Sequence, residues 1–251
     1  MPRTLNGARW PLLILVVPTF VACGGGDEES TTVQVLAAAS LTEAFSQLAE
    51  DYESEHEGVD VELIFGSSTD LAETVADDAP GDVLATADKA AMTIAVDAGV
   101  TEADPVVFAE NQLVVVTAPG NPEGIESLDD LADVDWVRCA DDVPCGRVSL
   151  ELLDAAGVTP APVSLEVDVR ATLEKVSTGE VDAGLVYASD AVAAGDDVEA
   201  TQIEGSEEFP AVYYIAPLAQ SADADLAADW IELVTSEDGR AALEEAGFSG
   251  P

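Results

Sequence analysis

"NQLVVVTAPG" at residues 111–120 and "FPAVYYIAPL" at residues 209–218 are the two stretches that decide how this chain folds. Both are more hydrophobic than their neighbours, and they flank the middle of the chain. We interpret each as a strand at which the chain leaves one lobe and enters another. Two crossings predict a first lobe from residues 32–112 and 211–251, a second lobe from residues 113–210, and a ligand cleft between them.

The rest of the chain alternates β-rich runs with helical patterns. Apolar side chains from Leu41 to Tyr52, for example, recur at the spacing of one helical face. This alternation predicts an α/β fold in which each lobe is a mainly parallel sheet flanked by helices. We expect strands at Thr32–Leu36, Val59–Phe65, Asp82–Thr86, Leu113–Thr117, Trp136–Arg138, Val163–Val167, Gly184–Tyr187 and Val212–Ala216.

The first 22 residues have the layout of a secretory signal peptide. Arg3 and Arg9 precede a short apolar run, and small residues lead up to Cys23. A cysteine at this place resembles the lipobox of bacterial lipoproteins, although Phe20 departs from the usual leucine. We expect residues 23–31 to be a flexible tether that a lipidated Cys23 anchors to the membrane outside the cytoplasm, with simple secretion as the alternative.

The charge of the chain excludes several classes of function. There are 51 acidic residues against 8 basic ones, a formal net charge of −43. Such a chain repels a phosphate backbone, so we expect no nucleic-acid partner. The acids are dispersed instead of clustered at ligand spacings, which favours a solvated surface over a metal-cation site. A hydrophobic content of 48% indicates that the chain folds.

Two cysteines remain after Cys23. Cys139 and Cys145 are six residues apart, and outside the cytoplasm such a pair can close into a disulfide, with free buried thiols as the alternative. The spacing is a weak signal for zinc, because the single histidine, His56, lies in the distant polar stretch "YESEHEG". We therefore predict a disulfide and no metal site.

Motifs of the common enzyme classes are absent from the sequence. It contains no G-x-S-x-G, no G-x-x-x-x-G-K-[ST], no H-E-x-x-H and no G-x-G-x-x-G. With one histidine, a Ser-His-Asp hydrolase is disfavoured. The many carboxylates leave open a secreted carboxylate-dependent hydrolase or a calcium-stabilised adhesion domain. We expect a binding protein without a cofactor and not an enzyme.

Small or hydroxyl residues recur where a strand meets a helix. A helix start presents unpaired backbone N–H groups and the positive end of a dipole, so several starts aimed at one point form an anion site without a formal positive charge. The junctions are Ser40 of "SLTE", Ser67 and Ser68 of "SSTDLAETV", Cys145 and Gly146 of "DVPCG", and Asp168 and Val169 of "DVRATLEKV".

The alternative is that the serines only cap their own helices. Ser40 with Glu43 matches a capping box, and Ser67 with Asp70 is a similar but weaker match. Taken one motif at a time, the sequence favours the caps.

Six segments in order resemble the molybdate-binding proteins of molybdate ABC importers. They are "VLAAASLTEAF", "FGSSTDLAETV", "APGDVLATAD", "NQLVVVTAPG", "VDVRATLEKVSTGEVDAGLVYASDAV" and "SEDGRAALEEAGF", spread over Val33 to Phe248. The resemblance implies a two-lobed periplasmic-binding-protein fold of the second topological type. It also implies a monomer that captures molybdate or tungstate and delivers it to a membrane permease. Another tetrahedral oxyanion, such as sulfate, is the alternative ligand.

The resemblance also implies which residues bind the oxyanion. Ser40 and Ser68 correspond to serines that bind through hydroxyl and backbone N–H, Cys145 and Val169 to residues that give a backbone N–H, and Tyr187 to a tyrosine that gives its hydroxyl. The family commonly has alanine where this chain has Cys145. Donors without acceptors disfavour hydrogen phosphate, which carries a proton, whereas sulfate has to be excluded by cavity size.

Overall fold

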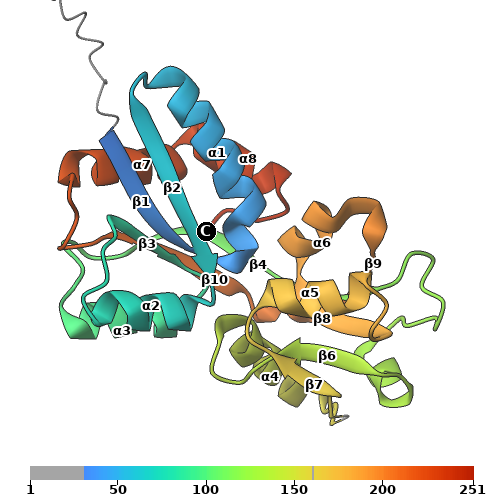
Figure 1. Ribbon diagram of the computed structural model, residues 1–251. Coiled ribbons are helices and arrows are strands. Elements are labelled where there is room, and N and C mark those ends of the chain that lie inside the picture. Colours follow the sequence, from blue (N-terminus) through green and yellow to red (C-terminus); the bar gives the residue numbers. More distant parts are fainter. Residues whose placement is uncertain (1–30, 160) are drawn as a thin grey trace, which may run out of the picture.

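The computed structural model describes residues 31–159 and 161–251 (Figure 1). The expected signal peptide and Cys23 lie outside these residues. In the described part, the chain forms two five-stranded sheets, ordered β2-β1-β3-β10-β4 and β7-β6-β8-β5-β9. The first of these sheets, with the helices that cover it, is called lobe 1, and the second, with its helices, is called lobe 2.

The strands and helices agree with the expected alternation. The strands are β1 Thr31–Ala38, β2 Val59–Gly66, β3 Val83–Thr86, β4 Val106–Asn111, β5 Leu113–Thr117, β6 Trp136–Cys139, β7 Ser164–Glu166, β8 Ala183–Tyr187, β9 Glu199–Gln202 and β10 Ala211–Pro217. The α-helices are α1 Thr42–Glu55, α2 Ser68–Ala76, α3 Lys89–Ala98, α4 Pro144–Ala156, α5 Val169–Ser177, α6 Ala188–Ala194, α7 Ala224–Thr235 and α8 Glu237–Glu245. Short 3-10 turns are η1 Ala39–Leu41, η2 Leu128–Asp133, η3 Gly195–Asp197 and η4 Ser206–Glu208.

The two sheets share one topology. In lobe 1, β2, β1 and β3 are parallel, and β10 runs antiparallel to β3 and β4. In lobe 2, β7, β6 and β8 are parallel, and β5 runs antiparallel to β8 and β9. Each sheet is therefore mainly parallel with one reversed strand. The reversed strands are the ones that follow the two crossings.

The crossings lie at the hydrophobic stretches that the sequence singles out. β4 of lobe 1 ends at Asn111, and β5 of lobe 2 begins at Leu113. The return connection runs from Gln202 at the end of β9 to Ala211 at the start of β10. One boundary differs from the expectation, because Thr31 is not part of a tether but begins β1 and pairs with Val59.

Two strands, β4 and β9, were not expected from the sequence. Both are edge strands. Edge strands are partly open to water and do not need the continuous apolar run of a central strand, so "EATQ" at 199–202 gives little hydrophobic signal. The same argument covers β4, whose first residue, Val106, is exposed and whose sequence ends in Glu-Asn.

Lobe 1 has helices on both faces of its sheet (Figure 1). The apolar face of α1 is buried as expected, and Phe45 packs edge-on against Trp230 of α7, with ring centroids 5.6 Å apart. On the opposite face, Leu71 of α2 and Met92 of α3 lie in a separate cluster with Leu84 of β3. Packing on both faces fixes where α1 and α2 begin, and both begin at the carboxyl ends of parallel strands.

Candidate functional site

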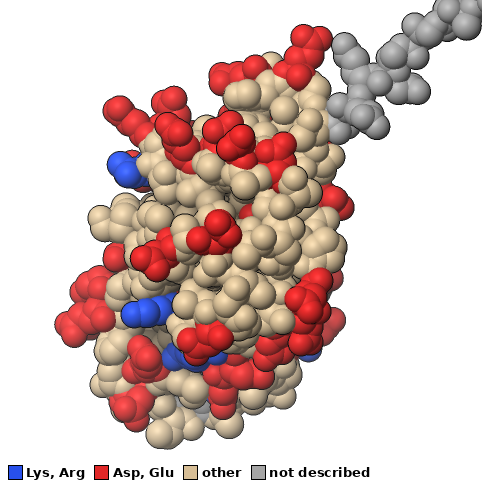
Figure 2. All heavy atoms as spheres, turned by 90° about the vertical axis from the view of Figure 1, so that its left-hand side faces the viewer, with Lys and Arg blue, Asp and Glu red and all other residues tan. Residues whose placement is uncertain are grey.

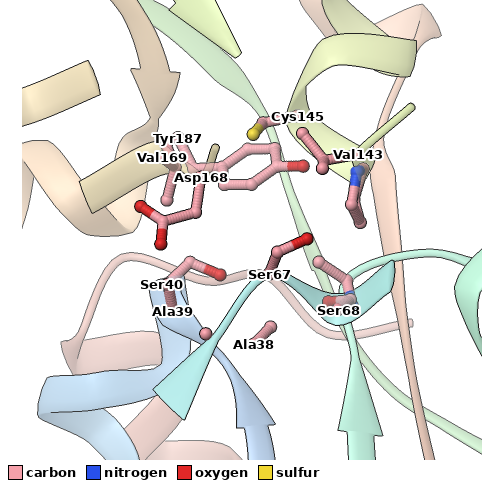
Figure 3. Close-up of a pocket in the computed structure, with 13 residues that line it drawn as sticks. Ala38, Ala39, Ser40, Ser67, Ser68, Val143, Cys145, Asp168, Val169 and Tyr187 are labelled. Atoms are coloured by element: carbon pink, nitrogen blue, oxygen red, sulfur yellow. The ribbon is translucent and has the colours of Figure 1, made fainter. Parts of the chain in front are cut away.

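A small cavity lies between the lobes, where strands from both sheets end (Figure 3). The centre of a water-sized sphere can move through about 20 Å³ of it. A space of this size holds a ligand of a few atoms and excludes a sugar or an amino acid. The lining residues are Ala38, Ala39, Ser40, Gly66, Ser67, Ser68, Ala87, Val143, Pro144, Cys145, Asp168, Val169 and Tyr187.

All five residues that the sequence singled out line this one cavity. Ser40 and Ser68 belong to lobe 1, and Cys145, Val169 and Tyr187 belong to lobe 2. In Figure 3 the two serines face the three lobe 2 residues across the cavity. Each follows or ends a parallel strand, because β1, β2, β6, β7 and β8 all direct their carboxyl ends to this place.

Ser40 does not cap α1, so the capping-box interpretation is wrong. The residue before α1 is Leu41, which makes no side-chain cap. The Ser40 hydroxyl instead lies 2.7 Å from the hydroxyl of Tyr213 on β10. When Tyr213 donates to this bond, Ser40 keeps its own proton for a ligand.

The cap expected at Ser67 is also wrong. Ser67 precedes α2 but makes no side-chain cap, and its buried hydroxyl has no hydrogen-bond partner among the described residues. The neighbouring Ser68 hydroxyl accepts a bond of 3.0 Å from the backbone N–H of Ala87 and retains its proton. Both hydroxyls can therefore donate into the cavity. Ser67 lines the cavity; the sequence placed it at a helix start that could face an anion, with a cap as the alternative, but the family resemblance did not include it among the binding residues.

Tyr187 presents the second unpartnered hydroxyl. It is the last residue of β8, and its oxygen is buried without a partner in the described residues. Burial raises the pKa of Tyr187 well above its usual value, and Tyr213, Asp88 and Asp190 raise it further, while Arg147 opposes them. The hydroxyl therefore stays protonated at neutral pH and can donate to an acceptor in the cavity.

Two helix starts complete the lobe 2 wall. Pro144 is the first residue of α4, so the N–H groups of Cys145 and Gly146 belong to the first turn, which has no intrahelical acceptors. At α5, the Asp168 carboxylate accepts from Ala171 N at 2.8 Å, which leaves the Val169 N–H at the helix start. In Figure 3 the Asp168 carboxylate is turned away from the hydroxyls of Ser67 and Tyr187.

A disulfide and a glycine fix the start of α4. Cys139 of β6 and Cys145 are joined by a disulfide, with their Cα atoms 5.7 Å apart. A Cβ on Gly146 would lie 1.7 Å from the carbonyl oxygen of Ala140, so only glycine fits there. The wall that carries Cys145 is therefore tied to the sheet by a covalent bond and by close backbone contact.

Most of the polar groups in the site are donors. Apart from Tyr187, the ionisable side chain in the wall is Asp168, which is held by its own helix. Within residues 31–159 and 161–251, no group of three His, Cys, Asp or Glu side chains could hold a metal ion. None of the helices in this part of the chain combines the length and apolar content of a bilayer span. The arrangement suits a small, fully deprotonated oxyanion.

Two lobes with a small cavity between them, at which several helix starts converge, define a solute-binding protein of the two-lobed class. Comparison with known proteins agrees, because residues 33–249 match the family described as bacterial extracellular solute-binding protein. The chain belongs to this family, with the fold of the second topological type of periplasmic binding protein, and therefore acts outside the cytoplasm.

Individual relatives cover nearly the whole chain. The molybdate-binding protein ModA of Mycobacterium tuberculosis is 37% identical over 248 residues, covering 94% of this chain and 95% of the relative. The periplasmic molybdate-binding protein of Azotobacter vinelandii superposes with a TM-score of 0.78 at 18% identity, covering 87% and 99%. The sulfate-binding protein SubI of M. tuberculosis superposes with a TM-score of 0.78 at 19% identity, covering 88% and 87%.

Substitution by phenylalanine of Tyr187, which lines the cavity, and of Tyr213, which bonds Ser40, is expected to have opposite effects on the ligand-free protein. Tyr187→Phe removes a buried hydroxyl that has no partner, so the free energy of unfolding should rise by about 1 kcal/mol. Tyr213→Phe leaves Ser40 without its bond, so the free energy should fall by about 1 kcal/mol. Urea denaturation in anion-free buffer measures both, and changes of the same sign would contradict this account of the site.

Asp190 next to Tyr187 is expected to make stability depend on pH. It is 1% exposed, and one carboxylate oxygen accepts from Tyr187 N at 3.1 Å while the other lacks a partner among the described residues. Burial raises its pKa from 3.8 to about 7, against the lowering effects of the Tyr187 N–H and Arg170. The unfolded chain therefore ionises first as pH rises, so this contribution to stability is present below pH 4 and is lost towards pH 7.

Asp190→Asn should remove the loss of stability that ionisation of Asp190 causes as pH rises. We expect the variant to be more stable than the parent by on the order of 3 kcal/mol at pH 8, and the advantage should shrink as pH falls to 4. Urea denaturation across this range is the measurement. Asp196→Asn, at an exposed acid nearby, is the control for net charge. A constant difference between Asp190→Asn and the parent would show that Asp190 does not titrate in this range.

Proposed function

We propose that this protein captures molybdate or tungstate outside the cytoplasm and delivers the unaltered anion to the permease of an ABC importer. The observation that carries the proposal is the pair of buried hydroxyls at Ser67 and Tyr187, which line the cavity between the lobes and have no partner among the described residues. Such groups cost stability unless a ligand accepts from them. The relatives named molybdate-binding protein support the choice of anion.

The proposed contacts come from both lobes. Ser40 and Ser68 bind through hydroxyl and backbone N–H, Cys145 and Val169 through backbone N–H, and Tyr187 through its hydroxyl, while Ser67 adds a further donor. If about six of these eight donors bond the anion at once, at ~1.5 kcal/mol each, they give roughly 9 kcal/mol before the costs of capture and desolvation. Micromolar to nanomolar affinity is within reach for a preorganised site.

Sulfate is the second candidate ligand. It has the charge and shape of molybdate, and a sulfate-binding protein is among the structural neighbours. The donors do not distinguish the two anions. Discrimination between them therefore depends on how well the cavity fits molybdate, whose metal–oxygen bonds are longer than the sulfur–oxygen bonds of sulfate. Hydrogen phosphate is disfavoured, because its proton would need an acceptor, and the Asp168 carboxylate is turned away from the hydroxyls of Ser67 and Tyr187 (Figure 3).

The N-terminal segment determines how the protein is held near its permease. We propose that residues 1–22 are removed as a signal peptide and that Cys23 becomes a lipidated anchor, with residues 24–30 as the tether. The binding domain works as a monomer, with a small inorganic oxyanion and the permease as its partners. It needs no cofactor and performs no catalysis, since a transport substrate leaves unchanged.

Calorimetric titration with molybdate, repeated in a large excess of sulfate, tests the proposed function. We expect saturable, one-site binding of molybdate that excess sulfate does not displace, because the closed cavity fits one anion. Binding of sulfate alone would move the function to the second candidate. Absence of heat with molybdate, tungstate and sulfate would overturn the oxyanion site.

Removal of single donors should weaken binding without unfolding the protein. Ser40→Ala and Tyr187→Phe each delete one bond to a charged ligand, so each should reduce molybdate affinity by about 1 to 3 kcal/mol. Ser206→Ala, at a buried serine that does not line the cavity, is the matched control. Calorimetric titration of the three variants with molybdate tests whether Ser40 and Tyr187 contact the anion. Equal affinities of the two cavity variants and the control would contradict that assignment.

A further inference from the structure

Basic side chains are scarce in this protein, and two of them reach from one lobe to the other. The described residues contain Lys89, Arg138, Arg147, Arg170, Lys175 and Arg240. Arg147 of lobe 2 pairs with Asp88 of lobe 1 at 2.6 Å, and Arg170 of lobe 2 pairs with Glu43 of lobe 1 at 2.6 Å. Figure 2 shows how few basic atoms stand among the acidic ones on one face of the molecule.

The Arg147 guanidinium makes contacts beyond this ion pair. Its Nε donates to Asp88 Oδ2 and its Nη2 to Thr69 Oγ1 at 3.3 Å, both in lobe 1. Its Nη1 donates to the carbonyl oxygen of Asp142 in lobe 2. Thr69 Oγ1 also donates to that carbonyl across the lobes, at 2.9 Å. These four residues form one hydrogen-bonded group across the cleft, which we call the Arg147 clasp.

Three members of the Arg147 clasp are chain neighbours of residues that line the cavity, and the fourth is two residues away from one. Thr69 follows Ser68, Asp88 follows Ala87, and Asp142 precedes Val143. Arg147 itself is two residues after Cys145 in α4. The clasp therefore lies directly behind the cavity walls of both lobes and fixes their separation.

Burial distinguishes this ion pair from the other cross-lobe pair. The side chains of Arg147 and Asp88 are 29% and 16% exposed, whereas those of Arg170 and Glu43 are 39% and 43% exposed. Exposed pairs contribute little because water and salt screen them. Asp88 is also held in place, since its other oxygen caps α3 by accepting from Ala91 N at 2.8 Å. The carboxylate is thus fixed before the lobes close.

We propose that Arg147 is a positioning residue that holds the closed lobes around the bound anion. It does not contact the ligand but ties Thr69 and Asp88 of lobe 1 to Asp142 of lobe 2. This inference rests on the proposed function, because closure has a purpose only if the cavity holds an anion. The charge of Arg147 is balanced by Asp88. Arg147 therefore stabilises the closed arrangement of the lobes without adding a net positive charge next to the cavity.

Arg147→Met should speed release of the anion. We expect molybdate affinity to fall about tenfold or more, mainly through faster dissociation in stopped-flow measurements, because opening no longer breaks the Arg147 clasp. The melting temperature of the ligand-free protein should change little, since each lobe keeps its own core. Arg147→Lys, which retains the pair with Asp88 but cannot reach Thr69 and Asp142 together, should recover part of the affinity.

Arg240→Met is the matched control, because it removes the same charge from an exposed arginine of lobe 1. It should leave affinity and dissociation rate within about twofold, as expected for an exposed charge. Asp88→Asn in a double-mutant cycle should show coupling with Arg147→Met, so that the double variant is little worse than either single one. Additive losses, or equal effects of Arg147→Met and Arg240→Met, would overturn the clasp.

Small-angle X-ray scattering separates a failure of the clasp from a failure of the proposed function. Without any added anion, Arg147→Met should have a larger radius of gyration than the parent, because its lobes open more often. If the parent binds no molybdate but this difference is present, the ligand assignment falls and the clasp stands. If the parent binds molybdate and Arg147→Met has the same affinity, dissociation rate and radius of gyration as the parent, the proposed role of the Arg147 clasp is wrong.

Discussion

The gathering of neutral hydrogen-bond donors that lack acceptors, in the cavity between the lobes, is the constraint on which the rest of this structure depends. The first-turn N–H groups of α2, α4 and α5 have no acceptor within their helices and need one elsewhere. The shared topology of the two sheets brings these starts together, because parallel strands end at the same edge of each sheet. Buried hydroxyls at Ser67 and Tyr187 add donors that also lack partners in the described residues. The fold thus leaves several donors without acceptors at one place, and an oxyanion could accept hydrogen bonds from them.

The acidity of the chain does not contradict an anion site. A surface carboxylate about 20 Å away interacts with a dianion in water by only ~0.4 kcal/mol, and a Debye length of ~8 Å weakens this further. Two acids close to the cavity are stabilised locally: the charge of Asp88 is balanced by Arg147, and Asp168 lies at the positive end of its own helix, where it accepts from Ala171 N. Contact hydrogen bonds therefore outweigh the long-range repulsion, whose main effect is to slow association at low salt.

Sequence reasoning succeeded where a pattern has one physical cause. Central strands and the buried face of α1 are continuous or periodic in hydrophobicity because each packs into the core of its own lobe, so they could be predicted. The edge strands β4 and β9 could not, since partial exposure removes that signal. The caps at Ser40 and Ser67 failed for another reason. A capping motif is local, whereas Tyr213, which bonds Ser40, is 173 residues away in the sequence, and only the folded chain shows that competitor.

Selection between anions of equal charge and shape requires walls that do not relax. In lobe 2 the start of α4 cannot move freely, because the disulfide ties Cys145 to β6 and Gly146 lies directly against the backbone of Ala140. Packed protein interiors transmit small displacements with little compression, so a wall fixed in this way turns a difference in bond length into a difference in binding energy. In lobe 1 the Ser68 hydroxyl is held by Ala87 N. Under the proposed function, size discrimination therefore depends on the second layer of contacts, and the donors in the cavity wall would supply affinity to any tetrahedral dianion that fits.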